Sequence, residues 1–291
     1  MSMPLGTMPL TERTLPNGIT LLTEPIAATK AVAIGFWFRM GSRDEREGEW
    51  GITHFIEHLL FKGTTKLSAS EIARFFDRVG GYVNAFTERE TMCLHCIVPA
   101  DYAVQALSIL SDMVWDSAPK DDDIEHERSV IESEILASLD DPEECGTDQA
   151  IALMFPGNSL SRSIAGSVDD IRGISAQSIR SFISEDLRCH SPIIAIAGSF
   201  VPDEAESFLV LRTSGMAICP LDRKSPAPVW NPGFFCPVSH FNQSQIFLSY
   251  PVTFSRDTKD WFSWDLINAI TGSFFSHSGK GMVFAIQSSA R

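Results

Sequence analysis

The stretch His54-Phe55-Ile56-Glu57-His58 places two imidazoles and a carboxylate within five consecutive positions. In a helix, at roughly 100° per residue, His54 lies at about 0°, Glu57 at about 300° and His58 at about 40°, so the three side chains share one side. Two imidazoles four residues apart can hold one zinc ion, and the carboxylate between them can take a proton from a zinc-bound water. The pattern is His-x-x-Glu-His, the reverse of the His-Glu-x-x-His helix, and it indicates a catalytic zinc site. The alternative is a buried helix whose two histidines pair with neighbouring side chains.

A zinc site needs a third protein ligand, and residues 121–139 are expected to form a helix that offers one. Three aspartates open this segment, where they favour the positive end of a helix. With Ile131 at the centre of the apolar face, Glu127 falls at about −40° and Glu134 at about −60°, on or beside that face. Two carboxylates facing the core need a compensating cation or hydrogen bonds, and a metal is one such cation.

The other glutamates of the same helix are expected to face solvent. Glu125 and Glu132 fall beyond about +90° from the centre of the apolar face. The alternative to metal binding by the core-facing pair is ion pairing with a basic residue, for example Arg128 or Arg74. These residues alone leave both interpretations open.

Three stretches together resemble the inverted-zincin peptidases of the pitrilysin (insulinase, M16) family, which includes the β subunit of the mitochondrial processing peptidase. The resemblance covers residues from about 12 to 200 well. The matching stretches are His54-Phe55-Ile56-Glu57-His58-Leu59-Leu60-Phe61-Lys62-Gly63-Thr64, Gly80-Gly81-Tyr82-Val83-Asn84-Ala85-Phe86-Thr87 and Glu127-Arg128-Ser129-Val130-Ile131-Glu132-Ser133-Glu134.

The resemblance implies roles for individual residues. His54, His58 and Glu134 match the ligands of one Zn²⁺ per chain, Glu134 lying 134 − 58 = 76 residues after His58. Glu57 matches the general base, and Glu127 a supporting acidic residue near the metal. The stretch Asn84-Ala85-Phe86 matches the edge strand along which the family lays extended peptides, which predicts substrate contacts at these three residues.

Composition limits the classes of partner. With 44% hydrophobic and 21% charged residues, the 291-residue chain has the composition of a globular protein, and its net charge of −14 argues against a nucleic-acid partner. No run of 18 apolar residues and no secretory signal are visible, so we expect no membrane span and a cytoplasmic location. Peptide is the expected substrate, and a sister subunit or a second copy is a possible partner.

The stretch Cys93-Leu94-His95-Cys96 is a second candidate for metal binding. It lies in an alternating pattern typical of a strand, so Cys93 and His95 should face one side and Cys96 the other. Three converging ligands are therefore not expected, and core packing is the preferred interpretation. The spacing of the six cysteines indicates no disulfide framework.

The sequence predicts an α+β fold that combines hairpins with long helices. Asn17-Gly18 marks a hairpin within residues 12–25, and Ser68 with Glu71 forms a capping box. Further strands are expected at 32–40, 82–87, 91–98, 192–197 and 245–250. The helix of the zinc motif is expected to start near Thr53 and to stop near Gly63. Further helices are expected at 68–79, 100–115, 121–139, 144–154, 175–187, 202–211 and 261–271.

The resemblance implies two similarly folded α/β-sandwich halves, the second of them incomplete. We expect a zinc-binding peptidase domain at 1–215, a proline-rich linker at 216–237 and part of a substrate-holding second domain at 238–291. The family's second half carries an Arg and a Tyr in a Gly-rich stretch. Residues 272–284 resemble the lead-in to that stretch, but the pair itself cannot be located before Arg291.

The sequence therefore predicts a zinc-dependent endopeptidase that hydrolyses extended peptides or unfolded segments, with Glu57 as the general base on zinc-bound water. A non-catalytic or truncated subunit that binds peptide or a sister chain is the alternative. The S-ribosylhomocysteine lyases also use a His-x-x-Glu-His helix, but they are far shorter and lack the helix that carries Glu127 and Glu134.

Overall fold

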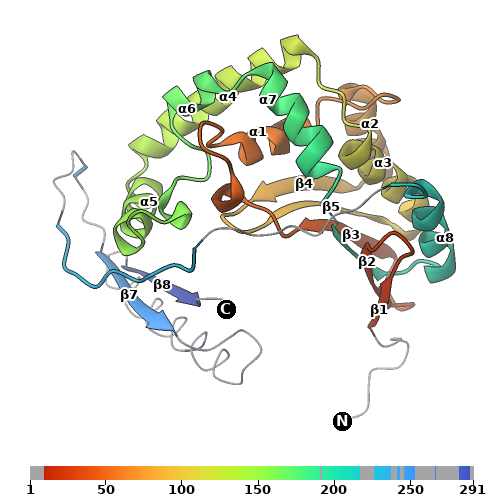
Figure 1. Cartoon of the computed structure of the whole chain (residues 1–291). Helices are drawn as coiled ribbons and strands as arrows, with labels where there is room; N and C mark the ends of the chain where they lie inside the picture. The colour runs from red at the N-terminus through yellow and green to blue at the C-terminus, as the bar shows by residue number, and fades with distance from the viewer. Residues whose placement is uncertain are drawn as a thin grey trace. The chain divides into compact units, whose positions relative to one another are not determined.

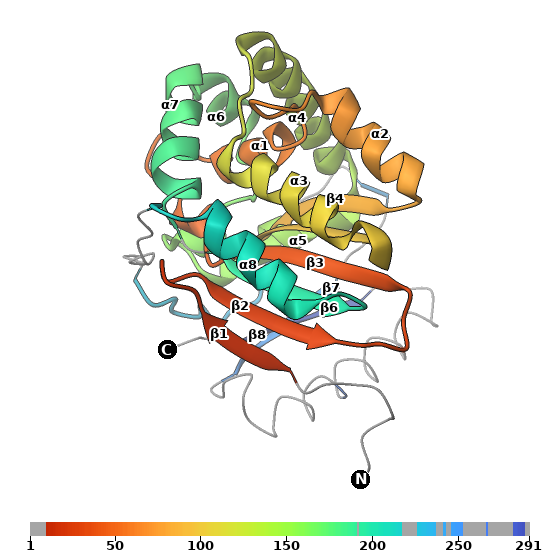
Figure 2. The same ribbon diagram turned by 90° about the vertical axis from the view of Figure 1, so that its right-hand side faces the viewer.

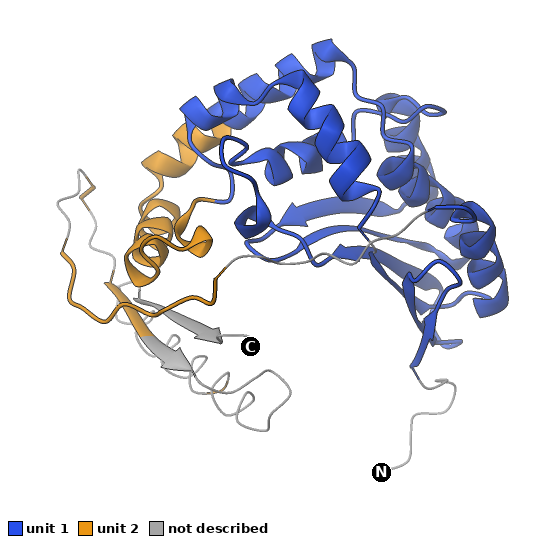
Figure 3. Ribbon diagram, in the orientation of Figure 1, with its two compact units in different colours: residues 1–132, 164–223 blue, residues 133–163, 224–291 orange. Residues whose placement is uncertain are grey.

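The structure is a computed structural model and describes residues 10–190, 192–216, 226–236, 241–242, 246–252, 266 and 282–288. Its contacts divide the chain into two units, residues 1–132 with 164–223 and residues 133–163 with 224–291 (Figure 3). The division falls within one continuous helix, α4 (Asp121–Asp140). The predicted domain limits and linker stay a prediction, because much of 216–237 lies outside the described residues.

The first unit is built on a six-stranded sheet in the order β1-β2-β6-β3-β5-β4 (Figures 1 and 2). Only β2 and β6 pair in parallel, and the other neighbours are antiparallel. The strands are β1 (Thr11–Thr14), β2 (Thr20–Pro25), β3 (Ala31–Phe38), β4 (Tyr82–Thr87), β5 (Met92–Pro99) and β6 (Ile193–Gly198). β4 therefore forms one edge of this sheet.

Helices cover one face of the sheet, as Figure 2 shows. The helices that contact its strands are α1 (Ile52–Leu59), α2 (Ala69–Val79), α3 (Ala103–Trp115) and α8 (Pro202–Arg212). The side chains of β3 alternate accordingly: Val32, Ile34, Phe36 and Phe38 are buried, whereas Trp37 on the opposite face is 40% exposed. This two-residue period, with one apolar face under helices, places the core between the sheet and the helices.

The second unit holds a smaller apolar cluster. Met154 at the end of α5 (Pro142–Met154) packs with Phe155, Leu160 and Trp230. Asn231 ties residues 226–236 to this helix, since its backbone N–H donates to the Met154 carbonyl at 2.8 Å. A parallel pair of strands, β7 (Ile246–Val252) and β8 (Met282–Ser288), belongs to the same unit.

The predicted α+β fold class is confirmed, and several local signals are confirmed with it. β1 and β2 form the predicted hairpin, with Gly18 at a φ of 95° in its turn. Ser68 and Glu71 form the predicted capping box at the start of α2. Both patterns depend on neighbouring residues alone, which is why the sequence is sufficient to predict them.

Four elements differ from the expectation. The helix of the zinc motif ends at Leu59 instead of near Gly63. The predicted helix at 175–187 is α7 (Ala176–Ser181) followed by a π-helical segment, Phe182–Leu187. The helix α6 (Val168–Gly173) and the strand β8 were not predicted. The predicted helix at 261–271, the Gly-rich lead-in before Met282 and Arg291 lie outside the described residues, apart from Leu266.

Candidate metal centre

The position of α1 is set at its first turn by a glycine and a buried carboxylate. Gly51 precedes the helix with a φ of 89°, and a Cβ there would lie 2.4 Å from the Ala165 carbonyl oxygen. The Glu45 carboxylate accepts hydrogen bonds from the backbone N–H groups of Gly51 at 2.8 Å and Thr53 at 2.9 Å. A negative charge on free N–H groups at a helix N-terminus is stabilising. Glu45 therefore caps α1, a role that no local spacing revealed.

The two histidines of α1 lie side by side. Their ring centroids are 4.7 Å apart, with the ring planes at 73°. Burial, and then the neighbouring His58, lower the pKa of His54 to about 4. Its buried Nδ1 has no hydrogen-bond partner among the described residues. A neutral imidazole with an unpartnered ring nitrogen is the form in which histidine binds a metal.

Glu127 of α4 is buried, and both of its carboxylate oxygens have partners. Its Oε2 lies 3.1 Å from Nδ1 of His58, and its Oε1 lies 2.6 Å from Nζ of Lys62. An ionised carboxylate only accepts, so Nδ1 of His58 is the donor, and in a neutral imidazole the other ring nitrogen then carries the lone pair. A carboxylate that holds the far side of an imidazole is the usual partner of a metal-ligating histidine.

Glu134 completes a possible donor set with the two histidines. One ligand atom from each of His54, His58 and Glu134 lies within 4.8 Å of the other two. Two imidazoles and one carboxylate form a donor set that suits zinc and leaves a fourth position open. Among the described residues, this is the one such group of three or more His, Cys, Asp or Glu side chains. The residues present therefore fit a zinc ion.

The predicted burial of Glu134 is wrong. Glu127 is buried as predicted, but Glu134 is exposed, and Glu132, which was expected to face solvent, is partly buried. Arg128 and Glu132 are partly buried where they contact Ile174 and Arg172, in the segment that holds the unpredicted helix α6. The alternative that Glu127 pairs with a basic residue is also partly right, since it pairs with Lys62.

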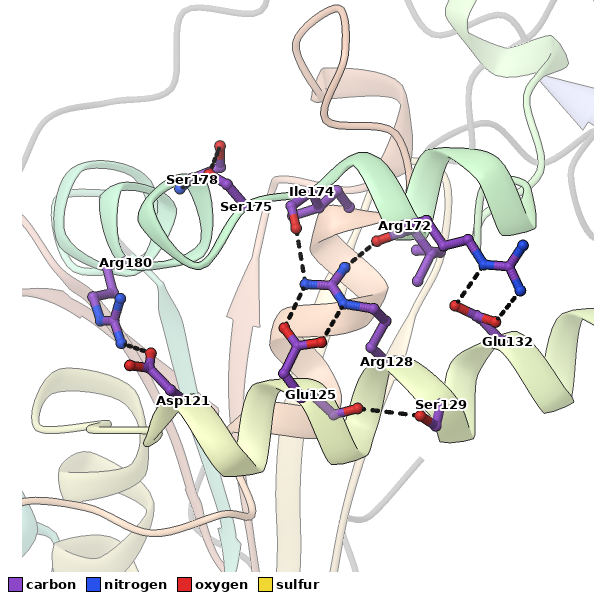
Figure 4. Close-up of polar contacts among 11 residues, drawn as sticks. Asp121, Glu125, Arg128, Ser129, Glu132, Arg172, Ile174, Ser175, Ser178 and Arg180 are labelled. Atoms are coloured by element: carbon purple, nitrogen blue, oxygen red, sulfur yellow. Dashed lines mark hydrogen bonds and ion pairs between the residues drawn. The ribbon is translucent and has the colours of Figure 1, made fainter.

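Figure 4 shows how residues 171–180 hold α4. The Arg128 guanidinium donates to the backbone carbonyls of Ile171 and Ile174, the latter at 2.9 Å, and pairs with Glu125. Arg172 forms two hydrogen bonds with Glu132, at 3.1 and 2.8 Å, and Arg180 pairs with Asp121. These contacts join α4 to residues 171–180.

Glu57 lies between α1 and the edge strand. Its Oε2 accepts a hydrogen bond from Oγ of Thr87, the last residue of β4, at 2.6 Å. Ala85 is buried towards the helices, whereas Asn84 is exposed. On the opposite face the Phe86 ring contacts Trp37 edge-on and His95 at a tilt. The three predicted substrate contacts therefore lie on the sheet's edge strand but on two different faces.

The cysteines of β5 follow the core-packing interpretation. Cys93 and Cys96 are buried, and burial raises the pKa of each thiol to about 12. Neither belongs to a group of three possible metal ligands among the described residues. Within the same residues, no helix combines the length and the low polarity that a bilayer crossing requires.

The profile of the insulinase family (peptidase family M16) matches residues 20–168, which is just over half of the chain, and the chain belongs to this family. It is 37% identical over 186 residues to an uncharacterized zinc protease of Streptomyces coelicolor, covering 64% of this chain and 40% of that protein. It is 34% identical over 208 residues to the uncharacterized zinc protease YmxG of Bacillus subtilis, covering 70% of this chain and 51% of that protein. The chain thus spans about half the length of these relatives.

Solved structures share the fold at lower identity. A peptidase M16 inactive domain from Pseudomonas fluorescens matches with a TM-score of 0.76 and 14% identity, over 91% of this chain and 65% of that one. The periplasmic protease PqqL from Escherichia coli matches with a TM-score of 0.70 and 17% identity, over 92% of this chain and 32% of that one. At these identities the likeness concerns the fold alone.

Proposed function

We propose that this chain is a zinc-dependent endopeptidase, or the metal-holding part of one, that hydrolyses peptide bonds in extended peptides or unfolded segments. The observation that carries the proposal is the convergence of His54, His58 and Glu134. Glu57 lies on α1 with the two histidines and contacts the sheet's edge strand. Family membership and relatives that are called zinc proteases support the same activity.

The donor set has the composition of a catalytic zinc site. His54, His58 and Glu134 would hold the ion, and Glu127 would orient His58 through its Nδ1. When bound, zinc would lower the pKa of a coordinated water and polarise the carbonyl of the substrate. The exposure of Glu134 agrees with a site that a substrate can reach from solvent.

Glu57 would act as the general base. Its carboxylate would take a proton from the attacking water and pass it to the leaving amine. The hydrogen bond from Thr87 holds one carboxylate oxygen next to the end of β4. The base and the strand that would hold the substrate are therefore joined by a direct contact.

The substrate would add to the sheet along β4. This strand pairs with β5 on one side and is terminal on the other, so its outward N–H and C=O groups can pair with an extended peptide. Such pairing recognises mainly the peptide backbone, so it suits unfolded segments of varied sequence. Asn84, Ala85 and Phe86 would supply the contacts, with the side chains of Asn84 and Ala85 on opposite faces.

The test combines metal analysis with a cleavage assay on an unfolded polypeptide. We expect about one zinc per chain, and cleavage that a chelator abolishes and added zinc restores. The assay is run on the chain alone and then with a sister subunit, because a partner or a second copy is proposed to supply further groups that hold the substrate. Absence of zinc would overturn the ligand assignment. Bound zinc without cleavage in either assay would favour a subunit that binds peptide without hydrolysing it.

A further inference from the structure

Lys62 makes a contact with the candidate metal centre that the proposed mechanism does not use. It lies in the turn after α1, four residues beyond His58, and its ammonium nitrogen is 2.6 Å from Oε1 of Glu127. The side chain is 27% exposed and its partner 5%, so the ion pair lies at the inner end of a mostly covered side chain. Such a pair is stronger than one on an open surface.

Lys62 is a cation in direct contact with the buried Glu127 carboxylate. Among the described residues, the carboxylate also lies 3.1 Å from Nδ1 of His58 and 3.8 Å from Nε2 of His126. His126 is 73% exposed and beyond hydrogen-bonding distance, so it is a poor substitute for an ammonium group. A buried carboxylate without a cation is costly, and Lys62 is the cation in contact with it.

The backbone beside Lys62 is held in place. The Lys62 N–H donates to the Leu59 carbonyl at 3.1 Å, and isolated bridges join Gly63 to Ser68 and Thr64 to Ser117. Gly63 has a φ of 121°, which a residue with a side chain rarely adopts. The backbone at Lys62 is therefore held by hydrogen bonds, which limits where its ammonium group can lie.

Glu127 and Glu134, two of the four glutamates of α4, differ in their surroundings. Glu134 is exposed and belongs to the donor set, whereas both oxygens of Glu127 are held, one by His58 and one by Lys62. A carboxylate that is held at both oxygens stays behind His58 and does not compete for the metal. The geometry thus separates one ligating glutamate from one orienting glutamate.

We propose that Lys62 is a positioning residue of the metal centre. It holds Glu127 against Nδ1 of His58, and so directs the other nitrogen of His58 at the metal and leaves the third ligand position to Glu134. This inference rests on the zinc site of the proposed function. It assigns Lys62 no contact with the substrate or the metal.

The test measures zinc affinity by competition with a chromophoric chelator, so it needs no peptidase activity. We expect Lys62→Met to weaken zinc binding by roughly tenfold, at the lower end of the range for outer-shell partners of a ligand. Lys62→Arg, which keeps the positive charge, should restore most of the affinity. Lys66→Met is the matched control, because Lys66 pairs with Asp112 and Asp116 and touches none of the proposed ligands.

A double-mutant cycle separates positioning from general loss of structure. If Lys62 acts through Glu127, Lys62→Met should add little to the loss already caused by Glu127→Gln. If the losses in zinc affinity caused by Lys62→Met and Glu127→Gln were fully additive, the role of Lys62 would be overturned while the proposed function would stand. The same holds if Lys62→Met binds zinc as tightly as the parent chain does. A parent chain that binds no zinc would overturn the proposed function instead. Thermal unfolding of the metal-free variants checks that each one folds.

Discussion

Two short stretches of this chain carry several metal-binding residue types, and only one of them brings its residues together. In α1 the period of the helix places His54 and His58 on one side, with ring centroids 4.7 Å apart. In β5 the period of the strand sends Cys93 and Cys96 to opposite faces of the sheet, and both are buried. Residue type and spacing indicate a metal site only together with the element that carries them.

The largest expected effect tests whether α1 is catalytic. Replacing Glu57 by Gln removes the base and keeps the shape of the side chain, so peptide cleavage should fall by about 10²- to 10⁴-fold while zinc stays bound. The measurement is the initial rate of cleavage with parallel metal analysis. The control is Glu47→Gln, which alters an exposed carboxylate in the loop before α1. Equal rates for the Glu57 variant and the parent chain would remove Glu57 from this role.

The next effect tests whether the donor set of α1 extends to α4. Glu134→Ala removes a proposed ligand, so zinc affinity should fall by more than about 100-fold, beyond the range for outer-shell partners. The matched control is Glu132→Ala on the same helix, which breaks the pair with Arg172 and leaves the donor set intact. Chelator competition gives both values. If the Glu134 variant binds zinc as tightly as the control, another residue must be the third ligand.

A smaller effect tests how far the metal centre depends on the start of α1. Gly51→Ala places a Cβ 2.4 Å from the Ala165 carbonyl at a positive φ, so it should lower the free energy of unfolding by roughly 3 kcal/mol. Gly48→Ala shares the positive φ but meets no atom within 4 Å, and its loss should be about 1 kcal/mol. Denaturant unfolding measures both losses. Equal losses would show that the close approach to Ala165 does not constrain α1.

The smallest effect concerns the reactivity of the two buried thiols of β5. Burial raises the pKa of the Cys93 and Cys96 thiols to about 12, so at pH 8 both stay protonated and should alkylate far more slowly than the exposed Cys236. Because the folded pKa values lie above the ordinary value of 9.0, the two thiols should destabilise the fold only above pH 9. Mass spectrometry after alkylation gives the rates. Faster labelling of this pair after zinc removal, in a chain that stays folded, would indicate a metal on β5.

Local patterns predicted much of the fold. The hairpin at Gly18 and the capping box of α2 depend on residues close in sequence, and both are found. The histidines of α1 could be placed for the same reason. Family resemblance was needed to choose Glu134, and the geometry of the donor set agrees with that choice.

The exposure of Glu134 and the partial burial of Glu132 could not be predicted. The helical period placed Glu127 and Glu134 on nearly the same side, but which side is buried depends on what packs against α4. The unpredicted helix α6 does so, through Arg172 and the Ile171 and Ile174 carbonyls. Lys62, Thr87 and Glu45 were also missed, because their partners are distant in sequence.

The sequence by itself determined which residues can form a metal site on α1, since a helix places residues four apart on one side whatever surrounds it. Only the tertiary structure decided the surroundings of that site: Glu127 held between His58 and Lys62, Glu134 exposed within reach of both histidines, and Glu57 bonded to the edge strand. These contacts join separate segments, and packing between segments depends on the whole chain.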